Sequence, residues 1–362
     1  MWMNKANTKI LICAGGTGGH IIPGLAIAHE LMAREYSVHW LGTKDGQEAQ
    51  LVPNTGIPIS YITISGLRGK RWFTPFIIQF KIIIAVFQSI KILLKLKPAL
   101  VIGMGGFVAG PGGFAAWLLR IPLIIHEQNA IAGTTNRILA RFAKKILEGF
   151  PNSFPNFKDV QHTGNPIRTD FLNVLPPKMR FTDKATAKLK LLVIGGSRGA
   201  LALNQCVPLA LQKCSSSTIE VWHQTGQNHL ENTLALYQQV QVTSKVVPFI
   251  NNMVEAYVWA DLVVCRAGAI TIAELAATGV GSILVPFPHA IDDHQTKNAE
   301  YLSRAGAAIL VPQHDLTPEK LSSMLNGFIE NRAKLIAMAE AARALANYKA
   351  LDNVVDQCLA WV

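Results

Sequence analysis

The segment from Lys9 to Ala28, KILICAGGTGGHIIPGLAIA, constrains the fold more than any other part of the chain. It begins with a short apolar run, Ile10–Cys13, continues with four glycines in five residues, and predicts a helix that opens near Pro23. A glycine-rich turn between a strand and a helix lets ligand atoms approach the backbone and directs amide groups and the helix dipole at negative charge. His20 stands at the exit of this turn, where an imidazole can take up a proton near neutral pH. The combination predicts chemistry on a phosphorylated or glycosylated ligand.

Apolar runs of strand length alternate with helix-length segments along the whole chain. The predicted strands are Ile10–Cys13, Val38–Leu41, Leu100–Gly103, Leu123–His126, Leu191–Gly195, Ile219–Gln224, Leu262–Cys265 and Ser282–Pro286. Continuous apolar strands joined by helices are typical of parallel sheets covered on both faces. A linker-like segment rich in Pro, Asn and Lys, 151–188, precedes a second strand and glycine turn at 191–204. We therefore expect an α/β fold of two Rossmann-like, doubly wound domains that face each other across a ligand cleft.

The charge balance narrows the class of ligand. The 362 residues carry a formal net charge of +11 but only 16% charged and 50% hydrophobic side chains. A basic surface attracts anions, and the shortage of charges favours an anionic membrane surface over nucleic acid, with a soluble enzyme of basic surface as the alternative. Five scattered cysteines without a CxxC motif predict reduced thiols in a cytoplasm, and the apolar run 10–13 is too short for a secretory signal.

The segment Phe73–Pro98 departs from the pattern of the other predicted helices. Its longest apolar run is about six residues, well short of the ~18 that suggest a transmembrane helix. On a helical wheel its polar residues, Lys81, Gln88, Lys91 and Lys95, fall within an arc of ~80°. Near its start, aromatic residues stand beside basic ones: they are Trp72, Phe73 and Phe76, and Arg68, Lys70 and Arg71. A helix that packs on the sheet is one interpretation, and an interfacial membrane contact is the one that we favour.

The glycine motifs exclude two common nucleotide-binding classes. Gly103–Gly113 holds six glycines in eleven residues and predicts a second surface of close approach. The spacing around Gly16–Gly19 does not match GxGxxG, and the second strand ends in Leu41-Gly42-Thr43 without an acid, which disfavours a nicotinamide enzyme. No GxxxxGK[ST] motif occurs, so a P-loop NTPase is excluded. We expect no cofactor.

Polar residues at predicted strand ends are candidates for ligand binding. Asn129 lies in a motif, HEQNAIAG, that serves either a cleft or a helix cap, and Arg168 suits a diphosphate unless it is an ordinary surface residue. Ser197 suits a phosphate at a helix start. Glu274 can accept hydrogen bonds from ribose hydroxyls, with an ordinary helix-dipole charge as the alternative, and Gln295 can bind sugar hydroxyls. The adjacent acids 292 and 293 are expected to cap a helix, and no metal site is expected.

Five ordered motifs resemble the MurG family of glycosyltransferases: GGTGGH, HEQN, GNP-x-R, GGS-x-GA, and CR-x-GA-x-T followed by Glu and DDHQ-x-x-NA. The resemblance covers nearly the whole chain, residues 8–345. The resemblance implies a GT-B fold and the inverting transfer of N-acetylglucosamine (GlcNAc) from UDP-GlcNAc to the C4 hydroxyl of lipid I, which yields lipid II for peptidoglycan. It also implies a peripheral protein on the cytoplasmic side of the cell inner membrane, with cell-wall synthesis proteins as possible partners. Arg198, Ala267 and Ile270 depart from the residues usual in that family.

The resemblance also assigns roles to residues and domains. His20 matches the proposed catalytic base, and the donor contacts map to Thr17, Gly18, Gly19, Asn129, Arg168, Ser197, Ile250, Ala269, Ile270, Thr271, Ile272, Ala273, Glu274 and Gln295. It implies an acceptor and membrane-associating domain over 7–168, joined by 345–362, and a UDP-GlcNAc-binding domain over 169–344. The alternatives are another GT-B enzyme, such as a UDP-GlcNAc 2-epimerase, and a nucleotide-sugar binding module without turnover.

Overall fold

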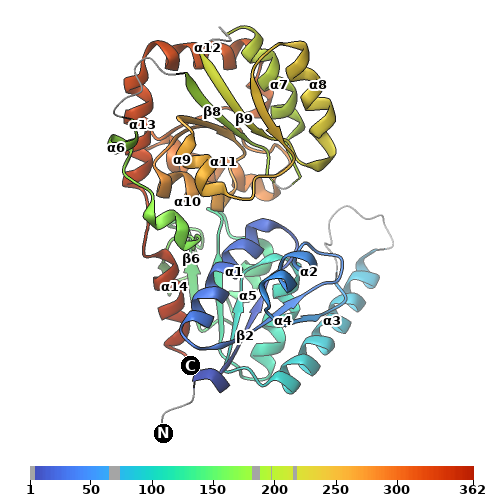
Figure 1. Cartoon of the computed structure of the whole chain (residues 1–362). Helices are drawn as coiled ribbons and strands as arrows, with labels where there is room; N and C mark the ends of the chain where they lie inside the picture. The colour runs from blue at the N-terminus through green and yellow to red at the C-terminus, as the bar shows by residue number, and fades with distance from the viewer. Residues whose placement is uncertain (1–4, 65–73, 182–187, 197, 215–217) are drawn as a thin grey trace. The chain divides into compact units, whose positions relative to one another are not determined.

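The computed structural model of the chain describes all residues except 1–4, 65–73, 182–187, 197 and 215–217, and it leaves out the side chains of 74–78 and 291 (Figure 1). The chain divides into two compact units. Unit 1 comprises Met1–Arg168 and Lys349–Val362, and unit 2 comprises Thr169–Tyr348. Each unit is built on its own parallel sheet and is described by itself below.

Unit 1 contains a sheet of seven described strands in the order β3-β2-β1-β4-β5-β6-β7. The strands are β1 Lys9–Cys13, β2 Ser37–Gly42, β3 Ile59–Tyr61, β4 Leu100–Gly103, β5 Leu123–Glu127, β6 Lys145–Glu148 and β7 Val160–His162. All pairings are parallel, and Ile10 of the central strand β1 pairs with both Val38 and Leu100. The direction of strand addition therefore reverses between β1 and β4.

Helices cover both faces of this sheet because successive strand residues point to opposite sides. The helices of unit 1 are α1 Gly18–Ala33, α2 Glu48–Leu51, α3 Thr74–Leu96, α4 Gly106–Leu118, α5 Thr134–Leu139 and α14 Ala350–Leu359, with 3-10 turns η1 Lys5–Asn7 and η2 Pro53–Thr55. Ile10 and Ile12 belong to the core with α1 and α14, whereas Leu11 and Cys13 belong to the core with α3, α4 and α5.

The C-terminal helix α14 is part of unit 1, although the whole of unit 2 precedes it in the sequence (Figure 1). Its buried residues, among them Val354 and Cys358, join the core beneath α1. Arg34, which follows α1, binds Asp352 at 3.0 Å and Asp356 at 2.5 Å. The end of the chain thus completes one face of the N-terminal sheet.

Unit 2 contains a sheet of six described strands in the order β10-β9-β8-β11-β12-β13, all parallel. The strands are β8 Leu189–Ile194, β9 Ile219–Gln224, β10 Ser244–Val247, β11 Leu262–Cys265, β12 Gly281–Leu284 and β13 Ala308–Leu310. Its helices are α6 Pro177–Arg180, α7 Leu201–Gln212, α8 Leu230–Gln239, α9 Met253–Trp259, α10 Ala269–Thr278, α11 His294–Ser303, α12 Pro318–Glu330 and α13 Arg332–Ala344, with 3-10 turns η3 Thr169–Asn173, η4 Gln227–His229, η5 Ile291–Asp293 and η6 Gln313–Asp315. One core cluster joins the sheet to α7, α8, α12 and α13.

The predicted α/β class with two doubly wound parallel sheets is confirmed, and each of the eight predicted strands is present. Two other predictions are wrong. The helix expected to open near Pro23 begins at Gly18. Pro23 is tolerated inside the helix because it removes only the hydrogen bond to the Gly19 carbonyl, and Gly19 is exposed to solvent. The segment 151–188 is not simply a linker, because it contributes β7 to the sheet of unit 1 and η3 and α6 to unit 2. Among the described helices none is both long and apolar enough to cross a bilayer.

Candidate active site

The strand order of unit 1 places its glycine-rich loops together. In an open parallel sheet, ligands bind at the carboxyl ends of the strands where the direction of strand addition reverses. That position lies between β1 and β4. The loop before α1 follows β1, the Met104–Gly105 turn follows β4, and the Gln128–Gly133 loop follows the neighbouring strand β5. Thr17, Gly18, Gly19, His20 and Asn129 therefore share one edge of the sheet.

A buried carboxylate holds the first glycine loop in place. Glu48 is fully buried and accepts a hydrogen bond from the Gly16 amide at 3.1 Å. It also accepts from the Thr43 amide at 2.9 Å and the Thr43 hydroxyl at 2.7 Å. Gly15 leaves no room for a side chain, since a Cβ atom there would lie 2.6 Å from Val108. These amide and hydroxyl donors offset the cost of burying the Glu48 carboxylate, and the bond to Gly16 holds the glycine loop in place.

His20 lies in the first turn of α1 rather than in the loop before a helix. Its side chain is half-buried, and its Nδ1 lies 2.8 Å from Oε1 of Gln128. The ring packs on the second glycine turn, because a Cβ atom at Gly105 would be 3.1 Å from His20 Cε1 and one at Gly106 would be 3.4 Å from Cδ2. Both glycines have positive φ angles, +92° and +74°, which side chains disfavour. The turn is thus built to receive the imidazole.

A second histidine lies behind Gln128. Nε2 of Gln128 is 3.1 Å from Nδ1 of His126 and 3.1 Å from the main-chain oxygen of His126. Nε2 of His126 lies 3.1 Å from the carbonyl oxygen of Gly164. His126 is completely buried, and this burial lowers its pKa to about 4, so the ring is neutral near pH 7. The HEQN motif therefore supplies more of the site than the one residue, Asn129, predicted from it.

Asn129 is fixed by the preceding glutamate. Glu127 is buried and accepts hydrogen bonds from the Asn129 amide at 3.0 Å and from Asn129 Nδ2 at 3.1 Å. Its other oxygen accepts from the Gly133 amide and from Asn136 Nδ2, each at 3.0 Å. The helix-cap alternative for Asn129 is wrong, because the N-cap of α5 is Gly133. Arg168 is half-buried and is the last residue of the first segment of unit 1, beyond β7.

Unit 2 has the same topological switch, between β8 and β11. The glycine turn after β8 packs on the turn after β9, since a side chain at Gly199 would collide with the carbonyl group of Thr225. Gly199 has a φ of +75°, and Arg198 beside it is exposed. Ser197, predicted to bind phosphate, lies outside the described residues. The loop after β11 leads directly into α10, whose N-cap is Gly268.

Glu274 occupies the sixth position of α10, where it is only 8% exposed. Its Oε2 accepts a hydrogen bond at 3.1 Å from the hydroxyl of Tyr257, a fully buried residue of α9. The alternative of an ordinary charge near the helix start is therefore wrong, because Glu274 is neither in the first turn nor exposed. A buried carboxylate oriented by a neutral donor is suited to accept further hydroxyl groups.

The other predicted residues of unit 2 lie at the same edge of its sheet. Ile250 is buried after β10, and Gln295 lies in α11, where its Oε1 accepts from the Phe287 amide at 2.9 Å. In α10 the predicted residues Ala269, Ile270 and Ile272 are buried, and Thr271 and Ala273 are partly exposed. Asn298 of α11 donates to the Ala267 carbonyl at 3.2 Å and ties the α10 entry to α11.

The acidic pair after β12 behaves differently from the expectation. Asp293 is the N-cap residue of α11, as predicted, but its carboxylate accepts from the Thr296 hydroxyl at 2.6 Å and makes no side-chain bond to a backbone amide. Both acids have left-handed backbones, with φ angles of 53° and 52°. Within the described part of the chain, no group of three or more His, Cys, Asp or Glu residues is arranged to hold a metal ion. All five cysteines are free and buried.

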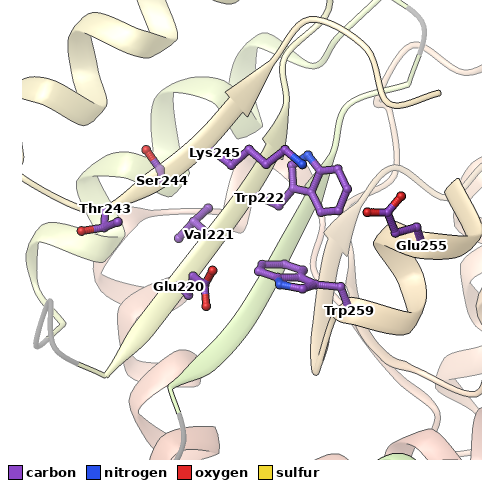
Figure 2. A pocket seen from close by; sticks show the side chains of 8 residues that line it. All are labelled: Glu220, Val221, Trp222, Thr243, Ser244, Lys245, Glu255 and Trp259. Atoms are coloured by element: carbon purple, nitrogen blue, oxygen red, sulfur yellow. The ribbon is translucent and has the colours of Figure 1, made fainter. Parts of the chain in front are cut away.

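A pocket at the edge of the unit 2 sheet contains none of the predicted site residues (Figure 2). It lies along β9 and the start of β10, and Figure 2 shows two indole rings, Trp222 and Trp259, with Lys245 beside the upper ring. The ring centres are 5.7 Å apart, and Lys245 Nζ lies 3.7 Å from the centre of the Trp222 ring. This pocket is separate from the loops that follow β8 and β11.

Comparisons with known proteins agree with this geometry. Residues 10–148 match the glycosyltransferase family 28 N-terminal domain, and residues 190–354 match the glycosyltransferase family 28 C-terminal domain. The chain is 49% identical over 352 residues, 97% of each chain, to the UDP-N-acetylglucosamine–N-acetylmuramyl-(pentapeptide) pyrophosphoryl-undecaprenol N-acetylglucosamine transferase of Marinobacter nauticus. It is 48% identical over 351 residues to the protein of the same name from Coxiella burnetii, with 97% of this chain and 98% of that one covered.

Solved structures give the same result. The crystal structure of Acinetobacter baumannii MurG superposes with a TM-score of 0.83 and 41% identity, covering 98% of this chain and 99% of that one. A Neisseria meningitidis UDP-GlcNAc 2-epimerase bound to UDP-GlcNAc superposes with a TM-score of 0.67 over 98% of this chain and all of that one. The epimerase is only 12% identical, so the likeness is one of fold alone.

Proposed function

Since this chain belongs to the MurG family of N-acetylglucosaminyltransferases, within glycosyltransferase family 28, we propose that the residues at its two sheet edges divide the reaction between them. The enzyme has the GT-B fold and transfers GlcNAc from UDP-GlcNAc to lipid I, N-acetylmuramyl-(pentapeptide) pyrophosphoryl-undecaprenol, in peptidoglycan synthesis. Unit 1 supplies the proton acceptor, and unit 2 supplies most of the contacts to UDP-GlcNAc.

The reaction requires a base at the acceptor hydroxyl. The C4 oxygen of the acceptor sugar forms a bond to the anomeric carbon of GlcNAc while the bond from that carbon to the diphosphate of UDP breaks. Attack opposite to the leaving group inverts the anomeric configuration. The hydroxyl proton passes to His20, which acts as the general base. The observation that carries this role is the anchoring of His20 through Nδ1 to Gln128 on a glycine turn, which leaves Nε2 to receive a proton.

Negative charge that develops on the leaving diphosphate needs fixed positive dipoles. Glycine turns at the start of α1 and after β8 present backbone amides, and Arg168 and Ser197 add a guanidinium and a hydroxyl group. Such donors cost little reorganisation when the loops are already held, as Glu48 holds the first one. We assign the diphosphate to these groups, together with Thr17, Gly18, Gly19 and Asn129.

The nucleoside and sugar of the donor are assigned to the carboxyl edge of unit 2. Glu274, with its carboxylate oriented by Tyr257, accepts the ribose hydroxyls. The start of α10, from Ala269 to Ala273, and Ile250 are mostly apolar and are assigned to contact the flat base and the ribose. Gln295 binds hydroxyl groups of the GlcNAc ring.

The exposed side of α3 suits attachment to a membrane surface. Phe80, Ile83, Phe87 and Leu94 are 65%, 52%, 67% and 57% exposed and recur at helical spacing on one side, with exposed Lys81, Lys91 and Lys95 next to them. The opposite side, with Ala85 and Leu93, is buried in the core with α4. Apolar rings beside lysines are suited to insert among anionic headgroups. We assign this stripe to docking on the cytoplasmic side of the inner membrane, where lipid I carries its polyprenyl chain.

The basic and aromatic cluster at 68–73 that first suggested this contact lies outside the described residues, as does the side chain of Phe76. Residues 80–95 of α3 therefore make the proposed membrane contact.

The experiment that tests the function is a transfer assay with two readouts. The protein is incubated with labelled UDP-GlcNAc and a short-chain lipid I analogue. We expect a disaccharide product and one UDP released for each disaccharide formed. Formation of the C2 epimer of UDP-GlcNAc without acceptor would indicate the epimerase alternative, and tight UDP-GlcNAc binding without any product would indicate a binding module.

A further inference from the structure

We propose that Gln128 is a positioning residue that fixes His20 in the tautomer with its proton on Nδ1, so that Nε2 is unprotonated before the acceptor arrives. The inference rests on the proposed role of His20 as general base. The hydrogen bonds around a neutral histidine determine which of its two ring nitrogens carries the proton.

The first step is the orientation of the Gln128 amide. One end of the amide lies 3.1 Å from the main-chain oxygen of His126. A carbonyl oxygen only accepts hydrogen bonds, so the group that faces it must be the NH2 of Gln128. The reverse orientation would set two oxygens against each other. The Oε1 atom of Gln128 therefore faces His20.

The second step is the proton on His20. Oε1 of a glutamine amide accepts hydrogen bonds and cannot donate one. It lies 2.8 Å from Nδ1 of His20, so Nδ1 carries a hydrogen. A neutral imidazole has one N–H, and Nε2 is then the nitrogen with a free lone pair. Among the described residues no side chain or backbone group is hydrogen-bonded to Nε2.

His126 strengthens the same orientation from behind. Its Nε2 lies 3.1 Å from the Gly164 carbonyl oxygen, which can only accept, so His126 carries its proton on Nε2. Its Nδ1 is then a lone pair, and it accepts from the NH2 of Gln128 at 3.1 Å. Complete burial keeps the ring neutral and lowers its pKa to about 4. The three hydrogen bonds are thus mutually consistent: His126 donates to Gly164, Gln128 donates to His126, and His20 donates to Gln128. The direction of all three follows from the Gly164 carbonyl oxygen, which can only accept.

The hydrogen bond to Gln128 keeps the His20 ring from turning over. A rotation that exchanged Nδ1 with Cδ2 would set a C–H group against the Gln128 oxygen and lose this bond. After His20 takes up a proton, Nδ1–H still donates to the same oxygen. A neutral amide therefore accepts from Nδ1–H in both protonation states without placing a negative charge beside the base.

The test is the 15N spectrum of histidine-labelled full-length protein, with the His20 signals assigned from the spectrum of His20→Gln. We expect the wild-type His20 to show a protonated Nδ1 and an unprotonated Nε2 at a pH where it is neutral. A wild-type His20 protonated on Nε2 would overturn the proposal.

Two substitutions at Gln128 separate positioning from a general structural role. Gln128→Leu removes the acceptor, so the Nε2–H tautomer should become populated and kcat should fall at least tenfold, with the KM for UDP-GlcNAc unchanged. Gln128→Glu keeps an oxygen toward Nδ1 but loses the NH2 group that donates to His126, so the Nδ1–H tautomer should persist even though the contact to His126 is lost. An unchanged spectrum and an unchanged kcat in Gln128→Leu would contradict the positioning role.

The same data distinguish this inference from the function on which it rests. Full activity of His20→Gln alongside an Nδ1–H tautomer in the wild type would reject His20 as the base and leave the tautomer assignment standing.

Discussion

Three buried carboxylates of the candidate site accept hydrogen bonds from amide or hydroxyl groups. Glu48 binds the glycine loop before α1, Glu127 binds Asn129 and the start of α5, and Glu274 accepts from Tyr257. Each donor removes part of the cost of burying the charge, and each bond also fixes a loop or side chain of the candidate site. At the scale of single residues, these hydrogen bonds fix the positions of the site residues.

The role of Glu274 predicts a loss of nucleotide affinity. Glu274→Ala should weaken UDP and UDP-GlcNAc equally, by about 1.5–3 kcal/mol, because the carboxylate is assigned to the ribose that both share. Tyr257→Phe should cost less, about 0.5–1.5 kcal/mol, because it only releases the carboxylate. Calorimetry measures both, with exposed Glu255→Ala as the control in the same unit. Unchanged UDP affinity in Glu274→Ala would remove this residue from the site.

Two buried histidines predict how stability depends on pH. Burial lowers the pKa of His126 to about 4 and that of His223 to about 3, both below the ordinary value of 6.5. Between these values and 6.5 the unfolded chain binds more protons than the folded one, so the free energy of unfolding should fall as the pH is lowered from 6.5. The slope is at most about 1.4 kcal/mol per pH unit for each histidine.

Urea unfolding at a series of pH values measures this slope. His223→Gln, which retains polar groups toward Tyr237 and Asn204, should reduce the slope between pH 6.5 and 4 relative to the wild type. Identical slopes would show that His223 is protonated in the folded protein.

The candidate residues could be predicted from the sequence where a local motif marks them, and not where the chain folds back. His20, Asn129 and Glu274 each stand within a short motif after a predicted strand. Glu48 lies 32 residues from the loop that it holds, and Gln128 lies 108 residues from His20. No local pattern reports such contacts, because they depend on which strands become neighbours in the sheet.

At the scale of elements, the described part of α3 exposes a stripe of large apolar side chains. Phe80, Ile83 and Phe87 are each more than half exposed, although aromatic and aliphatic side chains of this size are commonly buried. The helical wheel could predict the lysine arc from the sequence. It could not divide the broad apolar face into a buried side and an exposed stripe, because that division depends on how α3 packs on α4.

The stripe predicts binding to anionic vesicles. Wild-type protein should sediment with vesicles of anionic lipid at low salt and less at high salt, since each lysine near the surface contributes about 1 kcal/mol that salt screens. Replacing Phe80, Ile83 and Phe87 together by Ser should release the protein from vesicles and leave turnover on a water-soluble acceptor intact.

The matched control for the stripe is in unit 2. Leu175 and Met179 are 59% and 66% exposed, and their replacement by Ser should leave sedimentation unchanged. If the α3 variant sediments as well as the wild type, another surface makes the membrane contact.

Element boundaries show the same limit of sequence reasoning. The eight more apolar strands could be predicted, but β3, β6, β7, β10 and β13 could not, because they lie at or next to sheet edges and contain polar or only partly buried residues. Their apolar patterns are too short to differ from those of loops. Pro23 does not mark the start of α1, because proline is usual in the first turn of a helix but lies in the second turn here.

At the scale of the whole molecule, the order of strand, glycine turn and helix occurs twice and accounts for two parallel sheets. In each sheet the direction of strand addition reverses beside the strand that leads into the glycine turn. That repetition made the fold class predictable from the sequence alone. Function requires both units, because the assigned base is in unit 1 and the assigned ribose contact is in unit 2. Neither unit alone is expected to catalyse transfer.

The central claim is that His20 removes the proton of the acceptor hydroxyl, and the most direct test compares turnover and donor binding in one variant. His20→Ala should lower turnover by about 10²-fold or more. UDP-GlcNAc affinity, measured by calorimetry, should stay unchanged. His29→Ala, an exposed histidine on the same helix, should match the wild type in both. A His20→Ala turnover within a few-fold of the wild type would contradict the account and place the base elsewhere.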